Sequence, residues 1–167
     1  YYLELNKKIK TEFDVFTIMG GPHATFYPEC IENSTLDAIC IGEGESAFAD
    51  LLDSIGTGKD VSSIRNIKTH KNGANGIRPL IHDLDSLPFP DRDLFLQNTE
   101  LGDFPIKNFI ASRGCPYPCT YCFNHAYRLL YQGKGKTVRK HSVDYVIDEI
   151  LAVKGKYPLE FVKFYDD

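Results

Sequence analysis

The sequence that decides the fold occupies residues 106–122 and reads IKNFIASRGCPYPCTYC. Its first part, residues 106–112, has the short apolar pattern of a β-strand and leads directly into a loop with three cysteines. These are Cys115, Cys119 and Cys122, in the spacing C-x3-C-x2-C. The loop therefore carries three soft thiolate ligands, of the kind that iron–sulfur clusters and zinc prefer.

The other residues of the loop help to indicate which kind of metal site it forms. A cubane [4Fe–4S] cluster held by three cysteines leaves one iron with an open coordination site, where a substrate can bind. Pro116 and Pro118 stiffen the loop and remove two backbone donors. Tyr121 offers a flat apolar face directly before Cys122.

The loop resembles the signature C-x3-C-x-aromatic-C of the radical S-adenosylmethionine (radical SAM) superfamily, through Cys115, Cys119, Tyr121 and Cys122. The resemblance implies a [4Fe–4S] cluster on the three cysteines, whose open iron chelates SAM and cleaves it reductively to a 5′-deoxyadenosyl radical. It also implies that Tyr121 packs near the adenine of SAM and that an electron donor such as flavodoxin or ferredoxin is a partner. We expect Asp166 to face the same site.

Two other interpretations of the cysteines stay open. His125 lies close after Cys122, so the four side chains also suit a closed zinc site of three cysteines and one histidine, although zinc ligands usually form two distant pairs. A closed cluster that only relays electrons is the other alternative. Cys30 and Cys40 lie in apolar surroundings, and we expect both to be inert core thiols.

The composition is ordinary for a globular protein, with 167 residues, 43% hydrophobic and 25% charged. The net charge of −4 gives no electrostatic reason to expect binding to nucleic acid or an anionic membrane. No apolar stretch approaches the ~20 residues that span a bilayer. The N-terminus lacks the pattern of a signal peptide, so we expect a cytoplasmic location. The chain has no initiator Met and is expected to be a piece of a longer protein.

Strands and glycine turns alternate in the first half of the chain. Apolar, β-rich runs at residues 14–19 and 36–41 end in the turns Gly20-Gly21 and Gly42-Glu43-Gly44. Helical spacing predicts a helix over residues 45–55. This alternation predicts an α/β fold with a mostly parallel, Rossmann-like sheet.

A β-hairpin is predicted after this helix. Residues 64–69 and 77–81 have strand-like composition and flank Asn72-Gly73, which is a strong signal for a tight turn between paired strands.

The second half predicts a different unit. Residues 83–104 contain two closely spaced prolines among acidic residues and are predicted to be an interdomain linker. Beyond it, Ser142 is a candidate N-cap of a helix that precedes a strand at residues 159–165. Together with the strand before the cysteines this predicts one βαβ unit, with the loop beyond the carboxyl end of its first strand. Active sites of (β/α) barrels lie at that rim, but two strands cannot close a barrel.

Three further segments, residues 20–25, 37–45 and 84–90, resemble the cobalamin (B12)-binding subfamily of radical SAM proteins. The resemblance implies the carboxyl-terminal part of a Rossmann-like cobalamin-binding domain at residues 1–82. It also implies a linker at 83–104 and the start of a radical SAM partial TIM barrel at 105–167. The implied cobalamin-binding residues are Gly20, Gly21, Pro22, His23, Gly42, Glu43, Gly44 and Glu45.

The two turns suit this role physically. Gly20 and Gly21 let the backbone approach a large cofactor closely. Residues 42–45 open a helix, where free backbone N–H groups can receive polar cofactor groups. The D-x-H-x-x-G motif that supplies a cobalt ligand in many cobalamin proteins is absent, and His23 is expected at the cofactor periphery or as a turn cap.

The leading hypothesis is therefore a cobalamin-dependent radical SAM enzyme acting on a small molecule. The family precedent is methyl transfer to an unactivated carbon or phosphorus, with ring formation or rearrangement as other outcomes. A radical SAM enzyme without functional cobalamin, and a non-catalytic zinc or electron-relay module, are the alternatives.

Overall fold

The computed structural model describes residues 1–71, 73 and 75–166. They form two compact units, Tyr1–Leu80 with Leu129–Lys134, and Ile81–Arg128 with Gly135–Asp167. Each unit is described by itself. Among the helices within these ranges, none is long and apolar enough to cross a membrane.

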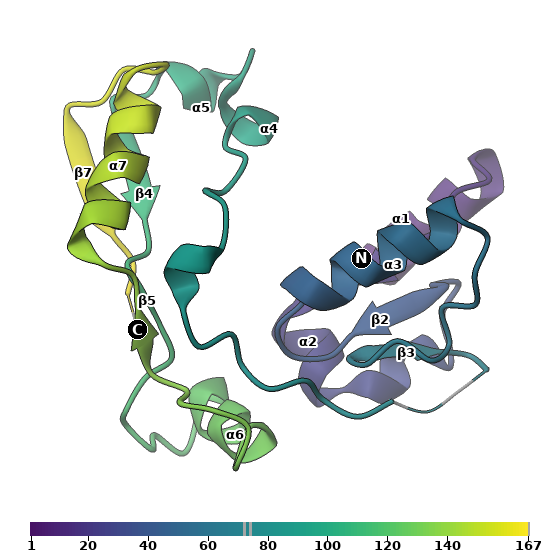
Figure 1. Ribbon diagram of the computed structural model, residues 1–167. Coiled ribbons are helices and arrows are strands. Elements are labelled where there is room, and N and C mark those ends of the chain that lie inside the picture. Colours follow the sequence, from purple (N-terminus) through teal and green to yellow (C-terminus); the bar gives the residue numbers. More distant parts are fainter. Residues whose placement is uncertain (72, 74, 167) are drawn as a thin grey trace. The chain divides into compact units, whose positions relative to one another are not determined.

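The first unit is a three-stranded sheet with helices on both faces. Its order is β1-β2-β3, with β1 parallel and β3 antiparallel to the central β2. In Figure 1, α2 and α3 lie on opposite sides of these strands. The elements are α1 (Tyr2–Glu12), β1 (Ile18–Met19), α2 (Gly21–Phe26), a 3-10 turn (Pro28–Ile31), β2 (Ala38–Cys40), α3 (Glu45–Gly56) and β3 (Ile67–Thr69).

The alternation of side chains along β2 explains why both faces are covered. Ala38 and Cys40 point to one face and pack with Leu51 of α3. Ile39 and Ile41 point to the other face and pack with Ala24 of α2. A strand buried on both faces is typical of the parallel part of an α/β sheet, so the predicted α/β class describes this unit.

The predicted hairpin is wrong. β3 pairs with β2, with Cys40 opposite Ile67, and residues 77–81, all of them described, form no strand. The backbone there bonds elsewhere, since the Arg78 N–H donates to Asn66 Oδ1 at 2.9 Å. Asn72, on which the turn prediction rested, lies outside the described residues.

The second unit contains the predicted βαβ pattern. Strands β4 and β7 pair in parallel, with Ile106 opposite Phe161, and α7 lies between them in the sequence and beside them in Figure 1. The elements are a 3-10 turn (Leu84–Ser86), α4 (Asp93–Leu96), α5 (Glu100–Asp103), β4 (Ile106–Phe109), β5 (Ser112–Arg113), α6 (Phe123–Leu130), β6 (Arg139–Lys140), α7 (Val143–Lys154) and β7 (Phe161–Phe164).

The start of α7 follows the sequence signal closely. Ser142 is its N-cap, and the Ser142 hydroxyl accepts a hydrogen bond from the Tyr145 N–H at 3.1 Å. The acidic segment before β4 reinforces this cap, since an Asp85 carboxylate oxygen accepts from the Ser142 N–H and pairs with His141 Nδ1 at 2.9 Å. The Ser142 hydrogen bond, together with His141, holds the pKa of Asp85 below its usual range.

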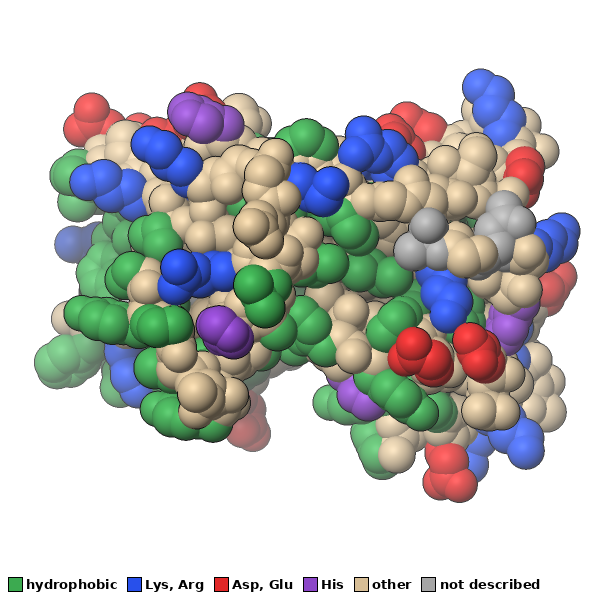
Figure 2. All heavy atoms as spheres, turned by 90° about the horizontal axis from the view of Figure 1, so that it is seen from below, with side chains coloured by type: hydrophobic (Ala, Val, Ile, Leu, Met, Phe, Trp, Pro, Cys, Tyr) green, Lys and Arg blue, Asp and Glu red, His purple; other side chains and the backbone are tan. Residues whose placement is uncertain are grey.

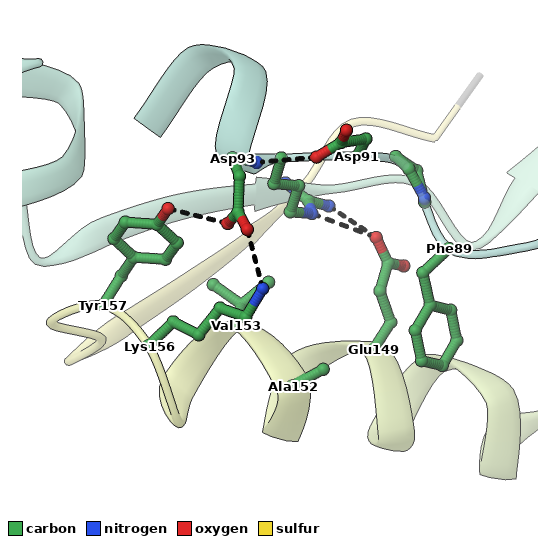
Figure 3. A pocket seen from close by; sticks show the side chains of 10 residues that line it. Phe89, Asp91, Asp93, Glu149, Ala152, Val153, Lys156 and Tyr157 are labelled. Atoms are coloured by element: carbon green, nitrogen blue, oxygen red, sulfur yellow. Dashed lines mark hydrogen bonds and ion pairs between the residues drawn. The ribbon is translucent and has the colours of Figure 1, made fainter. Parts of the chain in front are cut away.

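The predicted linker, residues 83–104, does not run as a free extended chain. It contains short helices and is bonded to α7 and the residues after it. Arg92 donates to Glu149 at 2.7 Å, and Asp93 accepts from Lys156 Nζ and Tyr157 Oη, both at 2.7 Å. Figure 3 shows these side chains around a cavity of about 160 Å³. The Arg92 guanidinium also lies 4.4 Å from the centre of the Phe109 ring. The domain boundaries 82/83 and 104/105 stay predictions.

Hydrophobic side chains also reach the surface. Figure 2 shows them between Lys, Arg, Asp and Glu side chains on the face that it draws. In the second unit, Phe161, Val162 and Phe164 of β7 are all exposed, so β7 is only partly covered by the described residues.

Candidate functional site

The cysteine loop is closed at its base by a short pair of strands. β5 and β6 are antiparallel, with Ser112 opposite Lys140 and Arg113 opposite Arg139. Directly after β5, Gly114 has φ of +81°, and a Cβ on it would lie 2.3 Å from the carbonyl oxygen of Thr137. Only glycine fits this approach of two backbones, so Gly114 fixes where the loop begins.

Further contacts hold the loop from its carboxyl side. The Cys122 N–H donates to the Cys119 carbonyl at 3.1 Å, forming a turn that runs into α6. From α6, the Arg128 guanidinium reaches back and donates to the Pro116 carbonyl at 2.8 Å. Prolines remove backbone donors but keep their acceptors, and Arg128 uses one of these acceptors.

The three cysteines of the loop are free thiols of intermediate exposure, whereas Cys30 and Cys40 are buried. Burial raises the pKa of both Cys30 and Cys40, which makes them poor thiolate donors and agrees with the expected inert role. The chemistry of the donor set on the loop thus fits a metal cluster. Within the described ranges, however, no three His, Cys, Asp or Glu side chains are gathered so that they could hold a metal ion, neither the loop cysteines by themselves nor a set that includes His125.

Tyr121 and Asp166, the two residues predicted to lie beside SAM, differ from each other in exposure and in contacts. Tyr121 is 92% exposed. The Asp166 carboxylate, directly beyond β7, accepts hydrogen bonds from the Ala111 N–H at 3.0 Å and the Ser112 hydroxyl at 2.6 Å. Asp166 therefore holds the chain at the entrance of the cysteine loop, a role that its sequence position did not indicate.

The two glycine turns of the first unit lie at one edge of the sheet. β1 and β2 are parallel neighbours, with Met19 opposite Ile39, so the turns that follow them share the carboxyl edge, as expected. Gly21, with φ of +87°, opens α2, and no atom lies within 4 Å of the position of a Cβ on it. His23 is exposed and its ring lies 5.6 Å from that of Tyr27.

The second turn is held by three side chains that the sequence did not single out. The Gly42 N–H donates to Thr25 Oγ1 at 3.0 Å, and the Glu43 N–H donates to Tyr131 Oη at 2.7 Å. The buried Asn66 amide donates to the Ile41 carbonyl at 2.7 Å. The N–H groups of residues 42 and 43, expected to be free for a cofactor, are therefore bonded within the protein.

No local sequence signal marked these three residues. Thr25 and Tyr131 lie 17 and 88 positions from their partners in the turn. Asn66 has φ of +70°, a conformation that asparagine tolerates better than most residues.

No family model matches the chain. It is 36% identical over 160 residues to the uncharacterised methyltransferase PH0819 of Pyrococcus horikoshii, a match that covers 92% of this chain and 34% of the relative. It is 28% identical over 190 residues to the anaerobic magnesium-protoporphyrin IX monomethyl ester cyclase of Rubrivivax gelatinosus, covering 95% and 32%. The chain thus spans about a third of the length of these curated relatives.

The fold is similar to that of a solved radical SAM methyltransferase, TsrM from Kitasatospora setae. The TM-score is 0.62 to the structure of TsrM with cobalamin and a [4Fe–4S] cluster bound, at 17% identity, covering 99% of this chain and 33% of TsrM. It is 0.64 to the structure with tryptophan and a SAM analogue bound, at 15% identity, covering 99% and 32%. At these identities the likeness concerns the fold alone.

Proposed function

We propose that this chain is part of a cobalamin-dependent radical SAM enzyme that methylates, or closes a ring on, a small molecule. The observation that carries the proposal is the loop of free, accessible thiols with the radical SAM spacing, directly after the first strand of a βαβ unit. The fold likeness to TsrM and the relatives named as methyltransferase and cyclase agree with it.

Cys115, Cys119 and Cys122 would hold the [4Fe–4S] cluster, and the loop would leave one iron open. When bound, the cluster and SAM supply one-electron chemistry, with electrons from a donor such as flavodoxin or ferredoxin. The chain's own contribution is to position this loop. Gly114 sets its start, and Arg128 ties its centre to α6.

The glycine turns are proposed to bind the corrinoid. Both lie at the carboxyl edge of the sheet, where cofactors of open α/β sheets bind. The open space at Gly21 lets a large flat ligand approach the backbone. Since Thr25 and Tyr131 take the first N–H groups of the second turn, its contribution would be a fixed shape rather than free donors. No cobalt ligand is assigned, because His23 is exposed and pairs with Tyr27.

Iron analysis tests the cysteine assignment. The intact protein, prepared anaerobically, should contain about four irons and four sulfides per chain, the stoichiometry of the proposed cubane. Replacement of Cys115, Cys119 or Cys122 by Ala should lower the iron content to near zero, because two thiolates cannot retain the cubane. The matched control, Cys30→Ala, removes a buried thiol and should leave iron unchanged.

The electron paramagnetic resonance spectrum of the reduced protein tests the open iron. Addition of SAM should change the spectrum, since SAM binds directly to the cluster. A preparation that contains zinc and no iron, or iron lost equally from Cys30→Ala, would contradict the proposal. If the cluster responds to SAM but the protein takes up no corrinoid, only the cobalamin part of the proposal is contradicted.

A further inference from the structure

Among the described residues, Tyr131 is the largest fully buried side chain, and it comes from beyond the cysteine loop in the sequence. It belongs to Leu129–Lys134, the short segment that forms part of the first unit. The segment is anchored there twice more, since Leu130 packs against the core beside Ile39 and Ile41. The Leu80 N–H also donates to the Lys134 carbonyl at 2.8 Å.

The hydroxyl of Tyr131 lies directly against the second glycine turn. It accepts the Glu43 N–H at 2.7 Å, and a Cβ on Gly42 would lie 2.0 Å from it. Gly42 also has φ of +79°, which other residues rarely adopt. The turn and the hydroxyl therefore fit each other only when position 42 is glycine and position 131 carries a hydroxyl.

A phenylalanine at position 131 would leave the half-buried Glu43 N–H without the Tyr131 oxygen as its acceptor. A donor that burial keeps from full contact with water costs free energy when its bond is unmade, so the turn would open to find water or another acceptor. Thr25 and Asn66 would still hold the neighbouring groups, so the rest of the unit would keep its fold.

We propose that Tyr131 is a positioning residue that holds the Gly42–Glu43 turn in the shape that receives the corrinoid. The corrinoid part rests on the proposed function. Tyr131 acts through the backbone of the turn and needs no contact with the cofactor. Because Tyr131 lies nine positions after Cys122, the same stretch of chain that carries the cysteines also shapes the corrinoid turn.

Hydrogen exchange on the intact protein without corrinoid tests the positioning part. Tyr131→Phe should raise exchange in residues 41–47 about tenfold, because the lost acceptor destabilises the closed turn. Tyr145→Phe is the matched control, since it removes a hydroxyl that bonds to the Leu87 and Pro88 carbonyls of the second unit. Exchange in residues 41–47 that is equal in wild type and Tyr131→Phe overturns the proposal.

A second variant approaches the same contact from the other side. Gly42→Ala should also raise exchange in residues 41–47, because the new methyl meets the Tyr131 hydroxyl. In a protein that already carries Tyr131→Phe, Gly42→Ala should have a smaller effect than it has alone, because the nearest clashing atom is gone and only Cζ at 3.0 Å and the positive φ oppose the methyl. Effects that add fully would contradict a direct contact between the two groups.

Titration with hydroxocobalamin tests the corrinoid part. Tyr131→Phe should weaken binding about tenfold and shift the visible absorption bands at saturation, whereas Tyr145→Phe should change neither. Weaker binding with unchanged bands would make Tyr131 a stabilising residue only and overturn its positioning role. Equal binding by Tyr131→Phe and wild type overturns the inference and leaves the proposed function intact. A wild type that takes up no corrinoid removes the cobalamin part of the function, and this inference with it.

Discussion

The second glycine turn and the cysteine loop are held in opposite ways. In the turn, side chains from three distant parts of the sequence bind the backbone of residues 41–43 directly. The cysteine loop is held at its base by the β5–β6 pair and further along by the bond from Arg128 to the Pro116 carbonyl, and its thiols are not gathered. Side chains of the protein thus hold the turn closed, whereas the proposed cluster would have to draw the thiols together on binding.

The largest effect is expected at the start of the cysteine loop. Gly114→Ala adds a Cβ 2.3 Å from the Thr137 carbonyl oxygen, so the β5–β6 pair must separate. Together with the strain of φ at +81°, this should cost about 3 kcal/mol of local stability. The measurement is native-state hydrogen exchange of residues 112–113 and 139–140 in the intact protein.

Gly133→Ala is the control for this change. Gly133 has φ of +74° but no atom within 4 Å of the Cβ position, so it isolates the backbone strain, about 1 kcal/mol. Equal losses for the two variants would show that the base of the loop is not fixed by the contact with Thr137.

Among the residues that hold the second glycine turn, Asn66→Ala should cause the next largest loss of stability. It removes the donor to the Ile41 carbonyl, in a buried place, and the acceptor of the part-buried Arg78 N–H. Two backbone groups lose their partner on the fully buried Asn66 side chain, which costs about 2–3 kcal/mol in the first unit. Asn98→Ala, at an exposed residue with φ of +59°, should cost well under half as much. Hydrogen exchange of β2 and β3 measures Asn66→Ala, and exchange of residues 96–100 in the second unit measures Asn98→Ala.

A smaller effect is expected at Asp166. Asp166→Ala removes the acceptor of the Ala111 N–H and Ser112 hydroxyl, and should raise exchange of these residues about fivefold. Asp166→Asn keeps an oxygen acceptor and should restore most of the protection. If Asp166 instead contacts SAM, as its position in the sequence suggested, Asp166→Asn would weaken SAM binding without changing this exchange.

The features that sequence predicted well depend on short-range signals. Ser142 was expected as an N-cap, and its hydroxyl bonds three residues ahead. The parallel β4–β7 pair follows from two apolar runs joined by one helix, a pattern with few alternatives. The glycine turns were found because glycine is needed where φ is positive, as at Gly21 and Gly42.

The features that sequence missed depend on partners far along the chain. The strand at residues 77–81 failed to form because its donors bond to Asn66 and to Lys134 instead of to a neighbouring strand. The bond between Tyr131 and Glu43 joins residues 88 positions apart, which no periodicity or turn signal encodes. For the same reason the N–H groups of the turn were expected to be free.

The smallest expected effect is a loss of hydrogen-exchange protection at low pH. It compares the stability of the two ends of the same strands. At the end opposite the turn, Asp37 accepts from Lys10 Nζ at 2.9 Å and from the Thr17 N–H at 2.7 Å. Burial alone would raise the pKa of Asp37, but these hydrogen bonds outweigh it and hold the pKa below its ordinary value. A lowered pKa means that the folded state favours the carboxylate. The stability from Asp37 is therefore present above the ordinary pKa of about 3.9 and is lost as the pH falls through the lower folded value.

Thr25, Asn66 and Tyr131, which hold the turn, carry no group that titrates in acid. Between about pH 6 and pH 3, hydrogen-exchange protection at Thr17 and Ala38, corrected for the intrinsic rate, should fall more in wild type than in Asp37→Asn. Asn at position 37 keeps one acceptor and cannot be protonated in this range. Protection of residues 41–43 should change little in either protein. If the turn lost protection together with Thr17, the two ends of the strands would be coupled, and the turn would owe its shape to the whole sheet rather than to the three side chains that bind it.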